Sequence, residues 1–255
     1  YRLSMGCRAG SPLEEVLTLA DLYWTEMEAN EDLAVPVRSF QEMERARQAG
    51  KIACLLTVEE GGVCLGSLPL LRTLYRLGVR MLTLTWNYPN ELGRPNGQPG
   101  GLTRRGFQFL EEMENLGMIP DVSHLSDAGF WDLVRMARRP IIASHSNARA
   151  ICPHRRNLTD DQFRAVRDLG GVVGLNLYLH FVGEPTMDAL VAHVEHFLAL
   201  GGEKTLCLGG DMDGCEALAG GMTGIQDMPK LYDALKARGY GETLLEDIFW
   251  NNLRR

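Results

Sequence analysis

The sequence lacks several signatures that would place a protein in a specialised class. Among its 255 residues, no apolar run approaches the roughly 20 residues needed to cross a bilayer. No low-complexity stretch or block of like charge interrupts the chain. The formal net charge is −7. Nucleic acid and anionic membrane surfaces are therefore disfavoured as main partners, because both bind basic patches.

Cysteine is sparse, and its spacing predicts no disulfide framework. The six cysteines form no CxxC pair and show no short spacing typical of small disulfide-bonded domains. Cys54 and Cys207 lie inside apolar runs, where a free thiol behaves as a small core side chain. We therefore expect a reducing compartment and a cytoplasmic location.

The composition is that of an ordinary globular protein. Hydrophobic residues make up 45% of the chain and charged residues 23%. The length is sufficient for one large domain with a substantial core. Because no shift in composition divides the chain, we predict a single domain over residues 1–255.

Short apolar runs predict buried parallel strands. They lack the strict alternation of half-buried strands, which is typical of strands covered on both faces. The six runs are 52–58, 80–85, 118–122, 140–144, 172–176 and 205–209.

Amphipathic segments around these runs predict helices, and several carry start and stop signals. Ser11 is followed by Pro12 and Glu14, and Thr159 by Gln162, which are capping sequences. Glycine ends several of the helices. The predicted helices cover 11–29, 39–50, 67–77, 103–116, 159–170, 186–200, 228–238 and 242–253.

Strands separated by single helices imply right-handed βαβ units and a parallel sheet. A doubly wound open sheet and a (β/α)8 barrel both fit this order. No GxGxxG or GxxxxGK[ST] sequence follows a predicted strand, so the nucleotide-binding open sheets lose support. A barrel has eight strands, which is two more than the six runs predicted from this sequence.

Polar residues follow the predicted strands with a regularity that scattered surface residues would not show. In a barrel, the chemistry lies at the carboxyl ends of the strands. Imidazole and carboxylate are the ligands of zinc hydrolase sites, and a carboxylate can bridge two metals about 3.5–4 Å apart. The residues at these strand ends are Glu59, Glu60, Trp86, Asn87, His124, His145, Tyr178, Asp211 and Asp213.

Each of these residues also has a structural interpretation. One histidine after a strand is more often a hydrogen-bonded structural residue than a ligand, but two at neighbouring strand ends favour a metal site. Asp211 and Asp213 are equally consistent with turn residues before Gly214. Arg156, in the loop after the His145 strand, offers a guanidinium that can bind a carboxylate through two parallel hydrogen bonds. The histidines interpreted as surface or packing residues are His154, His180, His193 and His196.

The strand-end sequences, in this order, resemble the renal (membrane) dipeptidase family. The likeness runs from about residue 53 to residue 253, nearly the whole chain, and it implies a (β/α)8 TIM-type barrel. With six predicted strands, we expect the first one or two strands to be missing from this chain. The matching stretches are VEEGG (58–62), DVSHLS (121–126), ASHSNA (143–148), RRN (155–157), NLY (176–178) and GGDMDG (209–214).

The resemblance also implies roles for individual residues. Glu59 would bridge two zinc ions, and His124 and His145 would hold one of them. Asp211 would act as the acid–base group, and Arg156 would bind the C-terminal carboxylate of the substrate. Tyr178 would line the substrate site. Manganese or cobalt would also suit this ligand set.

Two departures from the family pattern stand out. Trp86 occupies the position where mammalian members have a histidine that polarises the scissile carbonyl, and Asn87 is a weak candidate to contact substrate in its place. No His-x-Asp pair, which supplies two zinc ligands in the family, occurs in the sequence. The chain also begins YRLSMG, without an initiator Met or a signal peptide. We therefore expect an N-terminally incomplete chain with one largely unliganded zinc site and weak or absent activity.

The function implied is a zinc-dependent dipeptidase that uses a metal-bound water and acts on small dipeptides. Two alternatives stay open. One is another metal-dependent amidohydrolase acting on cyclic amides, lactams or esters, and the other is a truncated barrel that binds without turnover. No nucleic acid or membrane partner is expected, and a homodimer is consistent with the family. The preferred dipeptide and its stereochemistry stay open.

Overall fold

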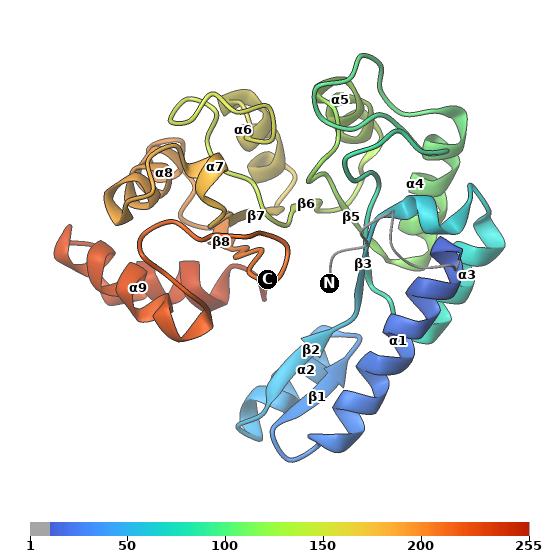
Figure 1. Ribbon diagram of the computed structural model, residues 1–255, viewed down its shortest axis with the longest axis horizontal. Coiled ribbons are helices and arrows are strands. Elements are labelled where there is room, and N and C mark those ends of the chain that lie inside the picture. Colours follow the sequence, from blue (N-terminus) through green and yellow to red (C-terminus); the bar gives the residue numbers. More distant parts are fainter. Residues whose placement is uncertain (1–10, 255) are drawn as a thin grey trace. The chain divides into compact units, whose positions relative to one another are not determined.

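The computed structural model describes residues 11–254, which divide into two compact units (Figure 1). The N-terminal unit contains the described residues up to Met136, and the C-terminal unit begins at Ala137. A single domain over residues 1–255 stays a prediction.

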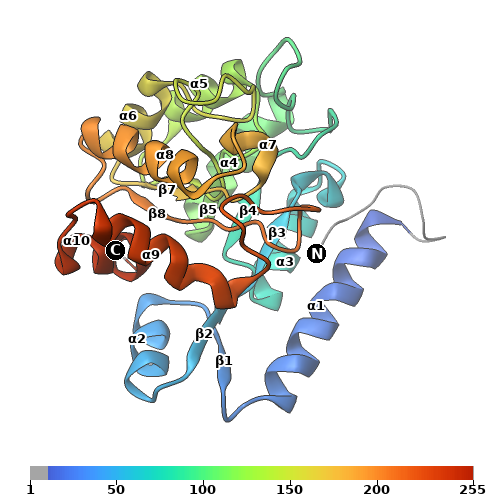
Figure 2. The ribbon, with the colours of Figure 1, turned by 60° about the vertical axis from the view of Figure 1, so that its left-hand side comes forward.

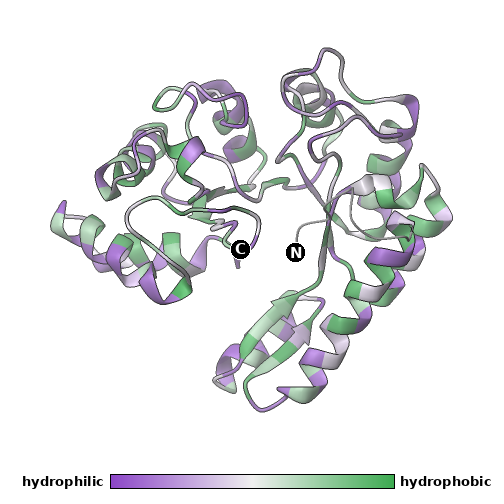
Figure 3. Ribbon diagram, viewed as in Figure 1, coloured by the Kyte–Doolittle hydropathy of each residue, from purple (hydrophilic) through white to green (hydrophobic). Residues whose placement is uncertain are grey.

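The N-terminal unit opens with a long helix and a small parallel sheet. Helix α1 (Pro12–Ala29) starts where the sequence signals predict, and Ser11 Oγ accepts the Glu14 N–H at 3.2 Å. Strands β1 (Ala34–Val37) and β2 (Ile52–Leu55) pair in parallel. Helix α2 (Phe40–Gln48) connects them and packs beside the pair (Figure 2). Both strands are hydrophobic along their length (Figure 3).

Three more parallel strands of this unit carry the strand ends of interest. They are β3 (Thr57–Glu59), β4 (Met81–Thr83) and β5 (Ile119–Asp121), which pair in chain order. A short 3-10 turn, η1 (Gly61–Cys64), follows β3. The helices of this region are α3 (Leu68–Leu77), α4 (Arg104–Leu116) and α5 (Asp127–Met136). Leu71, Leu82 and Phe109 are fully buried and form part of the core between them.

The C-terminal unit repeats the strand–helix order. Strands β6 (Ile142–Ala143), β7 (Val172–Leu175) and β8 (Leu206–Leu208) are parallel and pair in sequence. Phe163 and Phe197, from two of its helices, stack with ring centroids 4.3 Å apart. The helices are α6 (Asp160–Asp168), α7 (Leu179–Val182), α8 (Met187–Ala199), η2 (Ile225–Asp227), α9 (Met228–Ala237), α10 (Glu242–Glu246) and the π-helical turn η3 (Asp247–Asn251).

Most predicted elements are confirmed, and the exceptions have physical reasons. The single strand predicted over 52–58 is wrong, because the run breaks at Leu56 into β2 and β3, which pair in different sheets. Strand β1 was not predicted, since Pro36 lies inside it and a proline lacks the N–H of a ladder. Helices α5 and α7 were also missed.

The prediction that the cysteines form no disulfide framework agrees with the part of the chain that the structure describes. Cys54, Cys64, Cys152, Cys207 and Cys215 are all free thiols. Cys7 lies outside the described residues. Between residues 11 and 254, no helix has the length and apolar character that a membrane span requires.

The backbone is so crowded around β6 to β8 that Gly174, in β7, and Gly209, directly after β8, have no room for a side chain. A Cβ added at Gly174 would lie 2.1 Å from the carbonyl oxygen of Ser144, and one at Gly209 would lie 1.9 Å from the same oxygen. His145 follows Ser144 directly, so this close approach determines where the histidine is held.

We therefore expect Gly174→Ala to destabilise the protein, because the backbone of β6 would have to move. The free energy of unfolding in urea should fall by about 2 kcal/mol or more. Gly241→Ala is the matched control, since a Cβ there meets nothing within 4 Å. Equal stability of the two variants would contradict the close approach.

Candidate metal and substrate site

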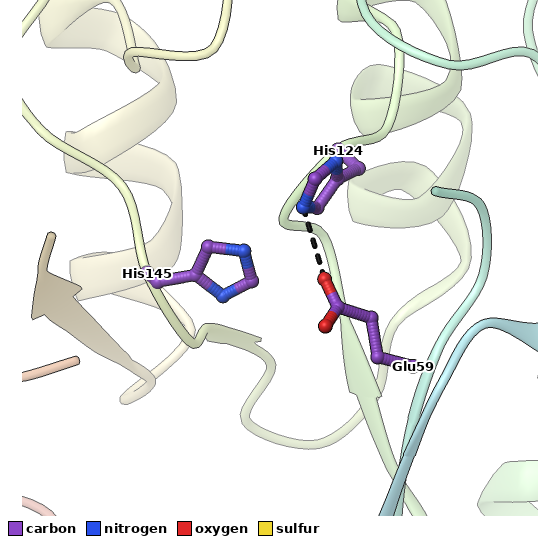
Figure 4. A group of neighbouring side chains, drawn as sticks. All are labelled: Glu59, His124 and His145. Carbon is purple, nitrogen blue, oxygen red and sulfur yellow. Dashed lines mark ion pairs between the residues drawn. The ribbon is translucent and has the colours of Figure 1, made fainter. Parts of the chain in front are cut away.

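In the N-terminal unit, two of the predicted metal ligands lie together. Glu59 ends β3, and His124 follows β5. His124 Nε2 lies 3.0 Å from Glu59 Oε1 (Figure 4). The His124 side chain is buried, whereas that of Glu59 is 37% exposed. Two ligand atoms on a tetrahedral zinc, each about 2.0–2.2 Å from the metal, are roughly 3.3 Å apart. The pair therefore fits a zinc ion.

A buried carboxylate shapes the turn that carries His124. Asp121 is fully buried, and its Oδ1 accepts the Ser123 N–H at 3.0 Å. Its Oδ2 accepts the hydroxyl of Thr83, on β4, at 2.7 Å. His124 then takes a left-handed φ of 68°, which is strained for a residue with a side chain. Asp121 thus ties two neighbouring strands to the turn. It was not predicted as a site residue, although an acid ending an apolar run was a visible signal.

The loop after β4 contacts both strand ends. The Trp86 N–H donates to Glu60 Oε2 at 3.0 Å, and burial raises the pKa of Glu60. Asn87 Oδ1 lies 3.0 Å from His124 Nδ1. The contact that the structure shows for Asn87 is therefore to a predicted ligand, and its predicted contact with substrate stays a prediction.

In the C-terminal unit, His145 follows β6 and is held through its own backbone. Its carbonyl oxygen faces Asn176 Nδ2 at 3.5 Å and Arg156 Nη2 at 3.4 Å, and both nitrogens are donors. Ser144 Oγ lies 2.7 Å from His145 Nδ1. His145 and Arg156 are both buried. A hydrogen bond therefore joins His145, predicted to bind metal, to Arg156, predicted to bind substrate.

Asn176, fully buried at the end of β7, is the centre of this half of the site. Its Nδ2 donates to Asp211 Oδ2 at 3.3 Å, and its Oδ1 accepts the Tyr178 N–H at 2.7 Å. Asn147 clasps its backbone reciprocally: Asn147 Oδ1 accepts the Asn176 N–H, and Asn147 Nδ2 donates to the Asn176 carbonyl, both at 2.9 Å. Sequence reasoning missed both asparagines as site residues. The available signal was their place near strand ends, since Asn176 ends the predicted strand 172–176 and Asn147 lies three residues after the predicted strand 140–144.

Aromatic rings support the arginine predicted to bind substrate. The Arg156 guanidinium lies over the Phe181 ring, 5.2 Å from its centroid. Tyr178 meets the same ring edge-to-face at 4.9 Å. Burial and the Arg156 charge lower the pKa of the neighbouring His154. Phe181 therefore places Arg156 and Tyr178 in one cluster.

Asp211 lies in a tight turn before Gly214, so it is a turn residue, as one of its two interpretations predicted. Its φ is 52°, and its carbonyl accepts the Gly214 N–H at 3.1 Å. A Cβ at position 214 would lie 2.1 Å from Asp211 Oδ1, so Gly214 makes room for the carboxylate. Burial, and then the Asp211 charge, raise the pKa of the Cys215 thiol to about 11. The turn uses the backbone carbonyl of Asp211, whereas the carboxylate of Asp211 contacts Asn176.

His193, on α8, is a packing residue, as predicted. It is fully buried, its Nδ1 accepts the Ala148 N–H at 3.1 Å, and its Nε2 lies 3.0 Å from the Val182 carbonyl. Its tautomer is therefore fixed, with the proton on Nε2. Burial lowers its pKa to about 4. Since Ala148 follows His145 by three residues, His193 anchors the loop that carries the predicted ligand.

Comparison with known proteins gives one consistent family. The family model for "Membrane dipeptidase (Peptidase family M19)" matches residues 7–255. A protein of Klebsiella pneumoniae, described as an uncharacterized protein in the pqqA 5′ region, is 35% identical over 232 residues, 85% of each chain. Dipeptidase 3 of Macaca fascicularis is 31% identical over 234 residues, 85% of this chain and 48% of that protein. The chain thus spans about half the length of the macaque relative.

A solved structure agrees with these relatives. The crystal structure of a metallo peptidase from Rhodobacter sphaeroides, liganded with a phosphinate mimic of the dipeptide L-Ala-D-Ala, matches with a TM-score of 0.88. The identity is 28%, and the match covers 94% of this chain and 72% of that chain. The parallel α/β fold, of the TIM-barrel type, is therefore confirmed.

The buried His193 predicts a pH-dependent stability. Its folded pKa of about 4 lies below the ordinary value of 6.5, so the unfolded chain binds the extra proton first as the pH falls. Its contribution is intact above about pH 6.5 and is lost progressively down to about pH 4. Between about pH 7 and pH 5, this loss amounts to about 2 kcal/mol.

Urea unfolding across this pH range measures the effect. His193→Gln is the matched variant, because an amide can donate to Val182 and accept from Ala148 without titrating. The wild type should lose about 2 kcal/mol more than the variant on acidification. Parallel pH profiles would show that His193 does not titrate as a buried neutral group.

Proposed function

Because the chain belongs to the membrane dipeptidase family, peptidase family M19, we propose that it hydrolyses dipeptides with a zinc ion held by Glu59, His124 and His145. Its family is one of metallo-dipeptidases. The observation that carries the proposal is the 3.0 Å approach of an imidazole nitrogen and a carboxylate oxygen at neighbouring strand ends. Figure 4 draws the three proposed donors, of which Glu59 and His124 come from the N-terminal unit and His145 comes from the C-terminal unit.

The donor set suits the chemistry of the family. When bound, zinc supplies a water of lowered pKa and polarises the scissile carbonyl. Two imidazoles and a carboxylate are a common protein ligand set of catalytic zinc, with a further position left for water or substrate. Under the same proposal, Glu59 would also be a ligand of a second zinc.

Proton transfer is assigned to Asp211. A carboxylate beside the reacting carbonyl takes a proton from the attacking water and passes it to the leaving amine. The Asn176 amide orients the Asp211 carboxylate through its 3.3 Å hydrogen bond. One carboxylate oxygen of Asp211 thus has a fixed donor.

Substrate recognition is assigned to Arg156, with Tyr178 beside it. The guanidinium presents donors in a planar fork that matches a carboxylate, and burial strengthens such a contact. A free carboxylate one residue beyond the scissile bond defines a dipeptide. The mimic bound to the Rhodobacter protein supports including a D-residue at the second position among the substrates to be tried. A cytoplasmic location and a homodimer stay predictions.

Metal-dependent hydrolysis is the first test. The purified chain, with zinc, manganese or cobalt added, is assayed against a panel of L,L and L,D dipeptides. We expect cleavage above background that requires a metal and is lost in His145→Ala, because a ligand is removed. Cleavage that persists in His145→Ala, or that proceeds equally well without added metal, would contradict the proposal.

The arginine assignment predicts a loss that depends on the substrate carboxylate. Arg156→Lys keeps the charge and removes the fork, so kcat/KM for a dipeptide should fall roughly 10- to 100-fold, the value of a charge-assisted contact. The same dipeptide with its C-terminus amidated is the control, and its slower hydrolysis should change little. A parallel loss with both substrates would assign Arg156 a structural role.

A further inference from the structure

Three consecutive residues after β4 contact the turns that carry both proposed ligands of the N-terminal unit. The Thr85 hydroxyl donates to the carbonyl of His124 at 3.3 Å. The Trp86 N–H donates to the carboxylate of Glu60, the residue after Glu59. Asn87 then meets the His124 ring itself. Residues 85–87 therefore hold the region of the metal site without supplying a ligand.

The two ring nitrogens of His124 face different groups. Nε2 lies 3.0 Å from Glu59 Oε1, on the side where the ion is proposed, and Nδ1 lies 3.0 Å from Asn87 Oδ1. A metal-bound histidine uses one nitrogen as ligand and donates its other N–H to an acceptor. That acceptor fixes both the tautomer and the orientation of the ring.

The orientation of the Asn87 amide decides which ring nitrogen of a neutral His124 carries the proton. With the oxygen toward the ring, the amide accepts the Nδ1–H and leaves the lone pair of Nε2 for a metal. With the amide reversed, its NH₂ would donate to Nδ1, and the proton of a neutral imidazole would sit on Nε2, where it blocks ligation. Only the first orientation suits the proposed site, and the structure places Asn87 Oδ1 toward Nδ1 of His124.

Nearby contacts limit how the His124 ring can move. Its centroid lies 6.2 Å from that of Trp86, which in turn lies 6.2 Å from that of Tyr88. The backbone of His124 is held separately, because its carbonyl also accepts the Asn96 N–H at 2.8 Å. Loss of the Asn87 side chain would therefore free the orientation and tautomer of the ring while the turn stays in place.

We propose that Asn87 is a positioning residue for the metal site: its Oδ1 accepts the Nδ1–H of His124 and presents Nε2 to the ion. This inference rests on the proposed function and deepens it, since it names a group that sets metal affinity. It gives Asn87 a role different from direct contact with substrate.

Zinc affinity, measured by competition with a chromophoric chelator, tests the inference. Asn87→Leu should bind zinc roughly 10- to 100-fold more weakly, as expected when a metal-bound histidine loses its acceptor. Asn87→Asp keeps an acceptor and should bind at least as tightly as the wild type. Gln98→Leu makes the same kind of change at another exposed loop position and should have no effect.

A spectroscopic readout separates positioning from a general structural effect. In the zinc-loaded protein labelled with ¹⁵N-histidine, His124 should carry its proton on Nδ1. In Asn87→Leu, this N–H signal should broaden or disappear through faster exchange with solvent, and it should persist in Asn87→Asp. Because Asn87 is exposed in a loop, both variants should fold, and circular dichroism verifies this.

Comparison with His124→Ala distinguishes failure of the Asn87 inference from failure of the proposed metal site. If His124→Ala loses zinc affinity while Asn87→Leu keeps both its affinity and its Nδ1–H signal, the inference is overturned and the metal site stands. If His124→Ala binds zinc like the wild type, the proposed site itself fails.

Discussion

Buried polar groups at the carboxyl ends of the strands must be hydrogen-bonded, and the rest of the site depends on this requirement. Leaving such a group without a hydrogen-bond partner costs about 1–3 kcal/mol. Each buried polar group therefore holds in place the strand or turn that carries its partner. Asp121 joins two strands and shapes the turn of His124. Asn147 and Asn176 clasp the ends of two more strands. The residues assigned to the chemistry are therefore held by neighbours that do none of it.

The sequence was most informative where local signals agree with the fold. The capping box at Thr159 and Gln162 forms as predicted, because both hydrogen bonds lie within four residues. The apolar runs located the strands, and the polar residues after them located the candidate site. Glu59 and His124 could be paired in advance because parallel strands place their carboxyl ends at one edge of a sheet.

Sequence reasoning failed where a tertiary partner decides the outcome. Nothing in the run 52–58 shows that Leu55 pairs with Val37 while Thr57 pairs with Met81, so the break at Leu56 was invisible. The roles of Asn147 and Asn176 depend on a reciprocal contact across 29 positions of chain. Asn87 resembled a substrate group, because an exposed polar residue after a strand does not reveal which side chain it meets.

The two units contribute different groups to the proposed reaction, and each group is held by contacts within its own unit. The N-terminal unit contributes the carboxylate and one imidazole, and its loop after β4 supports that imidazole. The C-terminal unit contributes Arg156 and Asp211, the groups assigned to substrate and proton, and both connect to the His145–Asn176 network. Disturbing Asn87 should therefore act through His124, whereas disturbing Asn176 should act through both Asp211 and the backbone of His145. The loop after β4 also holds Glu60, the residue after the proposed ligand Glu59, through the backbone N–H of Trp86.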